Sequence, residues 1–346
     1  MIRRNRLFVV LASGFVLLGM AITTPGVAWP SIAESFDRPL AELGLLTLIF
    51  GGSYTVSSSF SGRLVSKWGI GPALVGAAAT ALTALVGLSA SPSWPAFLFA
   101  VALLGLGGGL ADAATNTYVA LRRGARAMGL IHGVFGIGAI AGPLVVTVLF
   151  QLGLSWRVSF AVLALGQLVY VAALWRFSRD LSTPIKPSQD EGGSSVFKSG
   201  TAVWSILVFF VYAGIGAGAG AWAFTFLTVE GGIGDGAGGL VVAGYWGGFT
   251  ASRLLIGALG DRLHPDTVLR WAAVFTAAAF AVLWLAGSGW IAAGALVLAG
   301  FAHGPIFPLE MLLTARRFEA AVTSRMVGFE VAAANVGGAL LPFVMG

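Results

Sequence analysis

Six ionisable side chains lie inside long apolar stretches of the sequence. They are Asp112, His132, Arg253, His303, Glu310 and Glu330. Placing a charged group in the hydrocarbon core of a membrane costs roughly 2.5–3.5 kcal/mol even on scales derived from insertion experiments. Such a residue persists where it has a function or a partner of opposite charge. The six are therefore candidates for proton transfer, solute binding or ion pairing.

Asp112 is the first candidate for proton transfer. It lies ten residues before Arg122, or roughly 15 Å along a helix, which places its carboxyl group near the middle of a span. Asn116 follows one turn later on the same face. A carboxyl group at that depth is predicted to exchange protons, because a permanently charged form is expensive there. A carboxyl group hydrogen-bonded only for packing is the competing interpretation.

Arg253, Glu310 and Glu330 share a depth. Each lies about four to seven residues from the cytoplasmic end of its helix. An arginine without a partner is disfavoured in lipid, so we expect it to pair with one or both glutamates. This arrangement predicts a structural or gating latch beside Asp261 rather than a substrate site.

The segment His303-Gly-Pro-Ile-Phe-Pro308 is predicted to break the tenth span, because each proline removes a backbone donor. The freed carbonyls are tolerated where they face protein or a water-filled cavity, and such breaks are typical of transport sites. His303 either lines a cavity or packs against neighbouring helices.

Trp222 and Trp246 are the in-span tryptophans expected to face a cavity, where a sugar ring could stack; packing against other helices is the alternative. His132 either contacts substrate or donates to a nearby carbonyl.

The composition places these residues in a membrane. Of 346 residues, 57% are hydrophobic and 10% are charged, and the mean hydropathy is +0.90. A soluble domain carries roughly 25% charged residues, and about 20 apolar residues span a membrane as a helix. Apolar runs predict eleven spans, at 7–30, 40–62, 70–90, 95–121, 127–151, 157–176, 201–228, 237–259, 267–287, 290–315 and 325–345.

Basic residues predict the orientation of these spans. If the amino terminus is cytoplasmic, 17 of the 20 Lys and Arg residues fall in cytoplasmic segments. Acidic residues lie in the outer loops, and tryptophans at both ends predict two interfacial belts: Trp29, Trp94, Trp156 and Trp290 outside, and Trp68, Trp175, Trp204 and Trp271 inside. We expect a multi-pass protein of the inner (plasma) membrane with a cytoplasmic amino terminus.

The sequence also predicts two halves. Residues 177–200 form the long polar segment between an amino-terminal six-helix half, 1–176, and a carboxy-terminal half, 201–346. A short motif recurs in both halves between the second and third spans of each. The first copy begins at Gly62 and includes Ser66 and Lys67, and the second begins at Gly257 and includes Asp261 and Arg262. The glycines permit close helix packing, and the Asp-Arg pair can bind a neighbouring helix end.

With these loops and this topology, the chain resembles the major facilitator superfamily, an all-α membrane fold of two six-helix bundles. Ser66 stands where that family's loop has aspartate. The sequence ends after the eleventh span, where the resemblance implies a twelfth helix. Truncation is the favoured interpretation, and a fold that tolerates eleven helices is the alternative. The stretch Gly105-Leu-Gly-Gly-Gly-Leu-Ala-Asp-Ala-Ala-Thr-Asn116 looks like the fourth helix of fucose-permease-like sugar:proton symporters. That match implies that Asp112 carries the proton and that Asn116 contacts substrate.

Two further stretches are similar to the same branch. His132-Gly-Val-Phe-Gly-Ile-Gly-Ala-Ile-Ala-Gly-Pro143 has glycines that would let the fifth helix slide against the other half. In Tyr212-Ala-Gly-Ile-Gly216, Gly216 stands where an acid is common, and the first helix lacks the acid of that branch. Asp112 is the remaining candidate for proton coupling.

These observations predict a secondary transporter rather than an enzyme. We expect a monomer in the lipid bilayer that moves a sugar or related small polar metabolite by alternating access, either coupled to protons or facilitative. Asp112, Asn116, His303 and Trp246 would line its central cavity. An exporter of drugs or metabolites with the same fold, and a non-transporting membrane sensor or scaffold, remain alternatives. Glycine clusters without a strand or a GK[ST] motif do not indicate nucleotide binding, and three scattered histidines predict no metal site. No cofactor and no nucleic-acid partner are expected.

Overall fold

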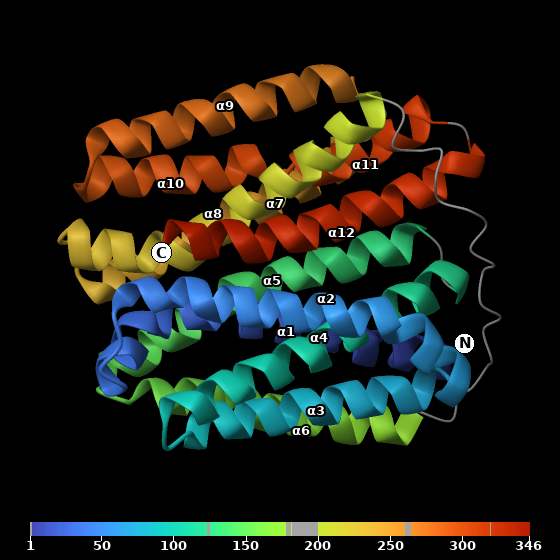
Figure 1. Ribbon diagram of the computed structural model, residues 1–346, viewed down its shortest axis with the longest axis horizontal. Coiled ribbons are helices and arrows are strands. Elements are labelled where there is room, and N and C mark those ends of the chain that lie inside the picture. The colour runs from blue at the N-terminus through green and yellow to red at the C-terminus, as the bar shows by residue number, and fades with distance from the viewer. Residues whose placement is uncertain (1, 123–124, 178–180, 182–199, 260–263, 319) are drawn as a thin grey trace. The chain divides into compact units, whose positions relative to one another are not determined.

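The computed structural model describes residues 2–122, 125–177, 181, 200–259, 264–318 and 320–346, and the regular elements within these ranges are all helices (Figure 1). Its contacts divide the chain into two compact units, Met1–Ser188 and Gln189–Gly346. The all-α membrane fold predicted from apolar runs is confirmed. Asp261, Arg262 and most of the predicted central segment lie outside the described residues.

Unit 1 contains six long helices. The first extends to Ser35, five residues past its predicted end, although Pro25 and Pro30 lie inside it. A proline removes one backbone hydrogen bond, and in membrane proteins neighbouring helices compensate for such a loss. The helices are α1 (Ile2–Ser35), α2 (Leu43–Trp68), α3 (Ile70–Ala90), α4 (Trp94–Arg122), α5 (Ala125–Gln151) and α6 (Trp156–Phe177), with a 3₁₀ turn at Leu40–Glu42.

Unit 2 contains the remaining helices. They are α7 (Gly200–Thr225, followed by a π-helical turn at Phe226–Glu230), α8 (Asp235–Leu259), α9 (Pro265–Ala286), α10 (Gly289–His303), α11 (Ile306–Arg317) and α12 (Ala320–Met345). Together α10 and α11 form the predicted tenth span, so its break is confirmed, and α12 is the eleventh. Among the described residues, ten helical segments are long and apolar enough to cross a membrane. The 25-residue α8 is not among them, because glycines and Arg253 lower its hydropathy.

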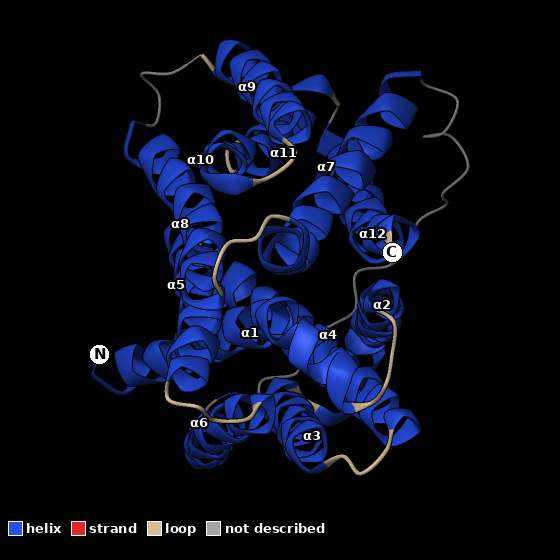
Figure 2. Ribbon diagram, turned by 90° about the vertical axis from the view of Figure 1, so that its left-hand side faces the viewer, coloured by secondary structure: helices blue, strands red, loops and turns tan. Residues whose placement is uncertain are grey.

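Helices pair in the same order in the two units. In unit 1, α1 packs chiefly on α5, α2 on α4, and α3 on α4 and α6. In unit 2, α7 packs on α12, α8 on α10, and α9 on α10. Figures 1 and 2 show α3 beside α6 and α9 beside α10 within their units. The first helix of each unit thus packs on its fifth span, as expected for a repeated helical unit.

Glycines allow the backbones of the paired helices to meet. A Cβ atom at Gly138 of α5 would overlap the carbonyl oxygen of Val16 in α1, and one at Gly142 would overlap the Thr23 hydroxyl. Gly138 and Gly142 therefore pack α5 onto α1 of the same unit, because their open side faces that helix. The predicted sliding of the fifth helix against the other half stays a prediction.

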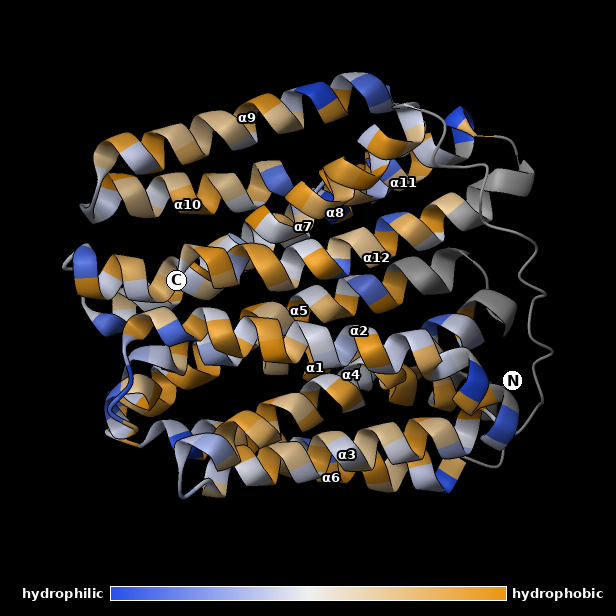
Figure 3. Cartoon of the chain, in the orientation of Figure 1, coloured by the Kyte–Doolittle hydropathy of each residue, from blue (hydrophilic) through white to orange (hydrophobic). Residues whose placement is uncertain are grey.

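Most residues along α3, α6, α9 and α10 are apolar, as the colouring of Figure 3 shows. Large exposed side chains include Phe99, Leu165, Val169, Trp284, Leu285, Ile291 and Leu298. In a soluble protein such surfaces would drive aggregation, and in a bilayer they contact acyl chains.

The predicted outer tryptophan belt is only partly correct. Trp290 is exposed, as are the four inner tryptophans, Trp68, Trp175, Trp204 and Trp271. Trp29, Trp94 and Trp156 are instead buried. Trp94 and Trp156 pack with Phe36 and Phe97, and Trp29 packs with Trp94. Arg157 lies 4.4 Å from the Trp156 ring and donates to the carbonyls of Ser89 and Ser91. These three tryptophans therefore pack inside one end of unit 1 rather than lie exposed at its surface.

Candidate functional site

Polar side chains from three helices of unit 1, α2, α4 and α5, lie around the Asp112 carboxyl group of α4. The Asn116 amide, one turn away, donates to the Asp112 carboxylate at 2.9 Å. The Tyr54 hydroxyl of α2 is hydrogen-bonded to the same carboxyl group, and His132 of α5 interacts with it electrostatically. Asp112, Asn116 and His132 therefore lie together in the structure, whereas their functional roles remain a prediction.

Close packing of α2 against α4 brings Tyr54 to this carboxyl group. A Cβ atom at Gly109 would overlap the Tyr54 carbonyl oxygen, and one at Gly108 would lie 3.4 Å from the Tyr54 ring. Both glycines precede Asp112 by about one turn, so they share its face of α4. Glycine at these positions lets the two backbones meet, and the Tyr54 side chain then reaches the Asp112 carboxyl group.

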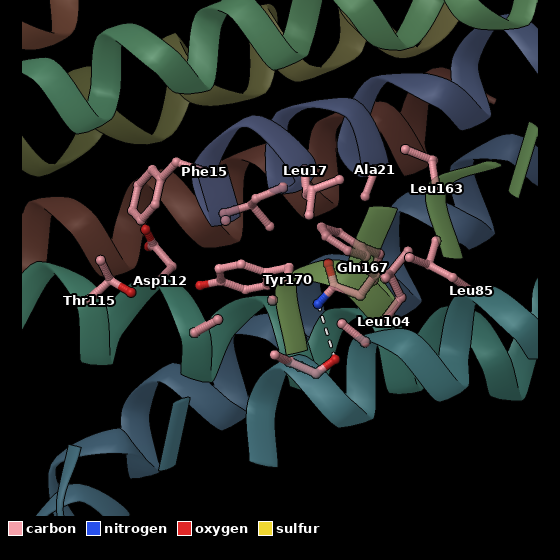
Figure 4. A pocket seen from close by; sticks show the side chains of 18 residues that line it. Phe15, Leu17, Ala21, Leu85, Leu104, Asp112, Thr115, Leu163, Gln167 and Tyr170 are labelled. Carbon is pink, nitrogen blue, oxygen red and sulfur yellow. Dashed lines mark hydrogen bonds between the residues drawn. The ribbon is translucent and has the colours of Figure 1, made fainter. Parts of the chain in front are cut away.

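A small cavity of about 40 Å³ borders Asp112 inside unit 1, between α1, α3, α4 and α6. Figure 4 shows Asp112, Thr115 and the hydroxyl end of Tyr170 at one end of this cavity, and Gln167, which donates to the Ala78 carbonyl at 3.0 Å, further along it. A water molecule needs roughly 10–15 Å³ by this measure, whereas small-molecule sites are ~300–1,000 Å³. The cavity can therefore hold water beside the carboxyl group but is too small for a sugar.

The Asn116 side chain keeps one polar atom for another group. The Asn116 side-chain oxygen is buried and has no hydrogen-bond partner among the described residues. His132 is exposed in the structure, and its ring meets the Phe15 ring edge-on at 5.7 Å. A hydroxyl group of a bound solute could donate to the free Asn116 oxygen, which the amide–carboxylate hydrogen bond keeps in place.

Arg253 of unit 2 does not have the predicted glutamate partners. Its Nε donates to the Gly304 carbonyl at 3.0 Å, and its Nη2 donates to the Tyr212 hydroxyl at 2.9 Å. The guanidinium lies over the Phe249 ring at 4.1 Å. Gly304 needs this donor because Pro308, four residues later, has no N–H to offer its carbonyl. Arg253 thus stabilises the break between α10 and α11.

The two glutamates have other partners, so the predicted latch is wrong as a single cluster. Glu310 pairs with Arg317 at 2.7 Å. Glu330 accepts hydrogen bonds from Ser205 at 2.5 Å and from Thr314 at 2.8 Å. Equal depth did not imply contact, because the Arg253 side chain points toward α7 and the helix break, whereas the glutamates lie where α7, α11 and α12 meet.

We predict that Glu330→Ala destabilises the protein. Glu330 is fully buried and holds two buried hydroxyl groups, so removing it leaves both without this acceptor. The expected loss is about 1–3 kcal/mol, which would appear as a lower melting temperature of the detergent-solubilised protein. Glu230→Ala, at an exposed carboxylate, is the matched control and should leave the melting temperature unchanged. Equal melting of both variants would contradict the role assigned to Glu330.

The other side chains of unit 2 that the sequence predicted to contact substrate are mostly packed against neighbouring helices. His303 is buried, its ring stacks on Tyr212 at 4.2 Å, and its Nε2 lies 3.0 Å from the Tyr212 carbonyl oxygen. Trp222 donates to the Pro342 carbonyl at 3.0 Å, so it fastens α7 to α12. Trp246 packs on Gly220, and its Nε1 has no partner among the described residues. Of the two tryptophans, Trp246 is the one that keeps a free donor.

Gly216 has a structural reason for lacking an acid. A Cβ atom there would lie 3.0 Å from the His303 Nε2. The Tyr245 hydroxyl also donates to the Gly216 carbonyl at 3.1 Å. His303 and Tyr245 therefore fill the space that a larger side chain at position 216 would need.

Residues 10–346 match the pattern of the Major Facilitator Superfamily. The chain belongs to this superfamily. It is 26% identical over 361 residues to a Helicobacter pylori (strain J99) protein provisionally named a glucose/galactose transporter, covering 97% of this chain and 87% of that one. The fold is similar to that of a D-xylose–proton symporter (TM-score 0.74, 15% identity, 98% of this chain and 89% of that one). It is equally similar to that of a bacterial homologue of the lysosomal transporter Spinster, with a TM-score of 0.74 and 15% identity, covering 99% of this chain and 81% of that one.

The predictions of a major facilitator fold and of a membrane transporter rather than an enzyme are confirmed.

The first copy of the recurring motif, which begins at Gly62, does not show the close helix packing that its glycine predicted. Gly62 is exposed, and a Cβ atom there would meet no described atom within 4 Å, so close packing does not explain this glycine. Lys67 is exposed as well. The second loop cannot be compared, because Asp261, Arg262 and the surroundings of Gly257 lie outside the described residues.

Sequence reasoning missed two tyrosines of this transporter. Tyr54 contacts the Asp112 carboxyl group, and Tyr170 borders the adjacent cavity. Neither belongs to a recognisable motif. The one available signal is that a tyrosine inside a span needs a partner for its hydroxyl, which makes it a candidate neighbour of a buried carboxyl group.

Proposed function

We propose that this major facilitator transporter moves a small polar solute, a sugar or related metabolite, by alternating access, and that Asp112 couples the movement to protons. The observation that carries the proposal is the Asp112 carboxyl group, held by Asn116 and Tyr54 beside a water-sized cavity. His132 of α5 interacts electrostatically with this carboxyl group, and the Asn116 amide donates a hydrogen bond to it. A carboxyl group in this setting can hold a proton and release it when its surroundings change.

Unsatisfied polar atoms support a polar solute. The Asn116 oxygen, the Trp246 indole N–H and the His303 Nδ1 are buried without a hydrogen-bond partner in the described part of the chain. Buried polar groups are normally paired, so groups that are left open are candidates for ligand contacts. The glucose/galactose name of the Helicobacter relative supports a sugar among polar solutes.

The membrane placement belongs to the same proposal. The distribution of basic residues supports a cytoplasmic amino terminus in the inner membrane. The lipid-facing apolar surface of both units supports a bilayer environment, and we propose that the protein works as a monomer.

Export of hydrophobic compounds is the second candidate. A groove of about 1,000 Å³ in unit 2, between α8, α9 and α10, is lined almost wholly by apolar side chains. Trp271, Phe275 and Trp290 lie along it. A groove of this chemistry fits an apolar compound better than a sugar.

Transport in proteoliposomes distinguishes the two candidates. We expect an imposed inward proton gradient to drive accumulation of labelled D-galactose or D-glucose, or of a related sugar derivative, and a proton ionophore to abolish it. Ethidium efflux should not differ from that of empty vesicles. Ethidium efflux without uptake of any polar probe would support the exporter and overturn the proposal. Movement of neither class would contradict both candidates.

A further inference from the structure

Arg253 is a cation within a span whose described partners are all neutral. They are the Gly304 carbonyl, the Tyr212 hydroxyl and the rings of Phe249 and Phe307. Dipoles and ring faces stabilise a guanidinium, but they do not neutralise its charge. The Nη1 nitrogen has no hydrogen bond within the described residues, and the side chain is only partly buried. The guanidinium can therefore accept an anionic partner.

The acids that could neutralise Arg253 are committed elsewhere. Glu310 pairs with Arg317, and Glu330 is held by Ser205 and Thr314. The other described acids of unit 2 lie at helix ends, at Glu230, Asp235 and Asp266. The remaining acids of the unit lie outside the described residues: Asp190, Glu191, Asp261 and Glu319. A charge inside a span without a counter-charge is costly, so an anion that is not among the described residues of unit 2 would stabilise Arg253.

Two further open donors lie on the same face of α8. Trp246, Thr250 and Arg253 follow the spacing i, i+4, i+7, which places them along one stripe of the helix. The Trp246 Nε1 and the Thr250 hydroxyl are buried and have no partner in the described part of the chain. The stripe thus carries one cation and two buried neutral donor groups that lack a partner among the described residues.

We propose that this stripe of α8 binds the anionic group of the transported solute, so that the substrate is a hydroxylated monocarboxylate, such as a sugar acid, rather than a neutral sugar. Arg253 binds the carboxylate with charge-assisted hydrogen bonds, which are about twice as strong as neutral ones. The Trp246 and Thr250 donors bind neighbouring hydroxyl groups. The inference rests on the proposed transport function and specifies its substrate class.

A charge balance follows from this substrate. One proton carried with one monoanion moves no net charge across the membrane. Uptake of the acid should therefore respond to a pH gradient and not to membrane potential, whereas proton-coupled uptake of a neutral sugar would respond to both.

The test uses D-glucuronate and D-glucose, which share a ring and differ in the carboxylate. In proteoliposomes of the full chain with an imposed pH gradient, we expect glucuronate uptake to exceed glucose uptake by at least about tenfold. A potassium diffusion potential set with valinomycin should leave glucuronate uptake unchanged. Proton-driven glucose uptake that equals or exceeds glucuronate uptake would overturn the inference and leave the proposed function intact. Uptake of neither probe would overturn both.

Two variants separate substrate binding from support of the helix break. Arg253→Lys keeps the charge, and Arg253→Gln keeps an amide donor for Gly304 without the charge. We expect Arg253→Lys to retain the preference for glucuronate and Arg253→Gln to lose it. If Arg253→Gln lowers the uptake of both probes by the same factor, or keeps the preference, Arg253 is only structural and the inference fails. If Arg253→Gln does not yield folded protein, the selectivity and voltage response of the wild-type chain decide.

Discussion

Replacing Asp112 by asparagine should abolish proton-driven accumulation of the solute while preserving exchange of solute across the membrane. Asparagine has nearly the same shape and can still accept from Asn116 and Tyr54, so the packing of α2 against α4 should persist. It cannot take up a proton in this range of pH, so uphill movement loses its driving force. We expect accumulation at equilibrium to fall to the level of empty vesicles, measured with labelled solute under an imposed pH gradient.

The control for this variant is Asn116→Ala. It removes the free oxygen and the amide donor beside Asp112 but leaves the carboxyl group. We expect a higher KM with accumulation still driven by protons. If Asp112→Asn accumulates solute as the wild type does, the carboxyl group is structural. If both variants lose exchange as well as accumulation, any substitution at this site blocks transport. The loss in Asp112→Asn would then not show that Asp112 couples transport to protons.

The largest effect on stability is expected for Gly138→Ala. The added methyl group would overlap the Val16 carbonyl oxygen, which is backbone and cannot rotate away. The pair α1 and α5 must then separate along its length. Overpacking typically costs about 1–3 kcal/mol, and a backbone obstacle places this substitution at or above the upper end of that range. We expect a marked drop in melting temperature, or failure to recover monodisperse protein from membranes.

Gly76→Ala is the matched control for this prediction. Gly76 lies in α3, is exposed, and a Cβ atom there meets nothing within 4 Å among the described residues. Alanine also favours helix over glycine by about 1 kcal/mol. This variant should be as stable as the wild type or more so. Equal stability of Gly138→Ala and Gly76→Ala would mean that α1 and α5 do not pack through Gly138.

The spans and the break in the tenth span were predictable because each depends on local sequence. A run of apolar residues identifies a membrane helix without knowledge of its neighbours. Pro305 and Pro308 likewise interrupt a helix wherever it packs, and the structure ends α10 at His303 and begins α11 at Ile306. The clustering of Asp112 with Asn116 was also local, since one turn separates them.

Contacts between helices were less predictable, because depth in the membrane does not fix the direction in which a side chain points. Arg253 and Glu330 lie at similar depth, yet one contacts the helix break and the other contacts Ser205. The partnership of Tyr54 with Asp112 depends on how closely α2 approaches α4, which two glycines set. Trp29, at a helix end typical of the lipid interface, is buried by packing that its position alone does not reveal.

The internal pH of proteoliposomes, followed while solute enters without any imposed gradient, tests the central claim most directly. If Asp112 binds a proton on one side and releases it on the other with each solute, protons enter together with the solute, so the interior should acidify in step with uptake. In Asp112→Asn vesicles, solute should still enter at constant internal pH. Solute entry without acidification in the wild type, or acidification that persists in the variant, would contradict proton coupling through Asp112.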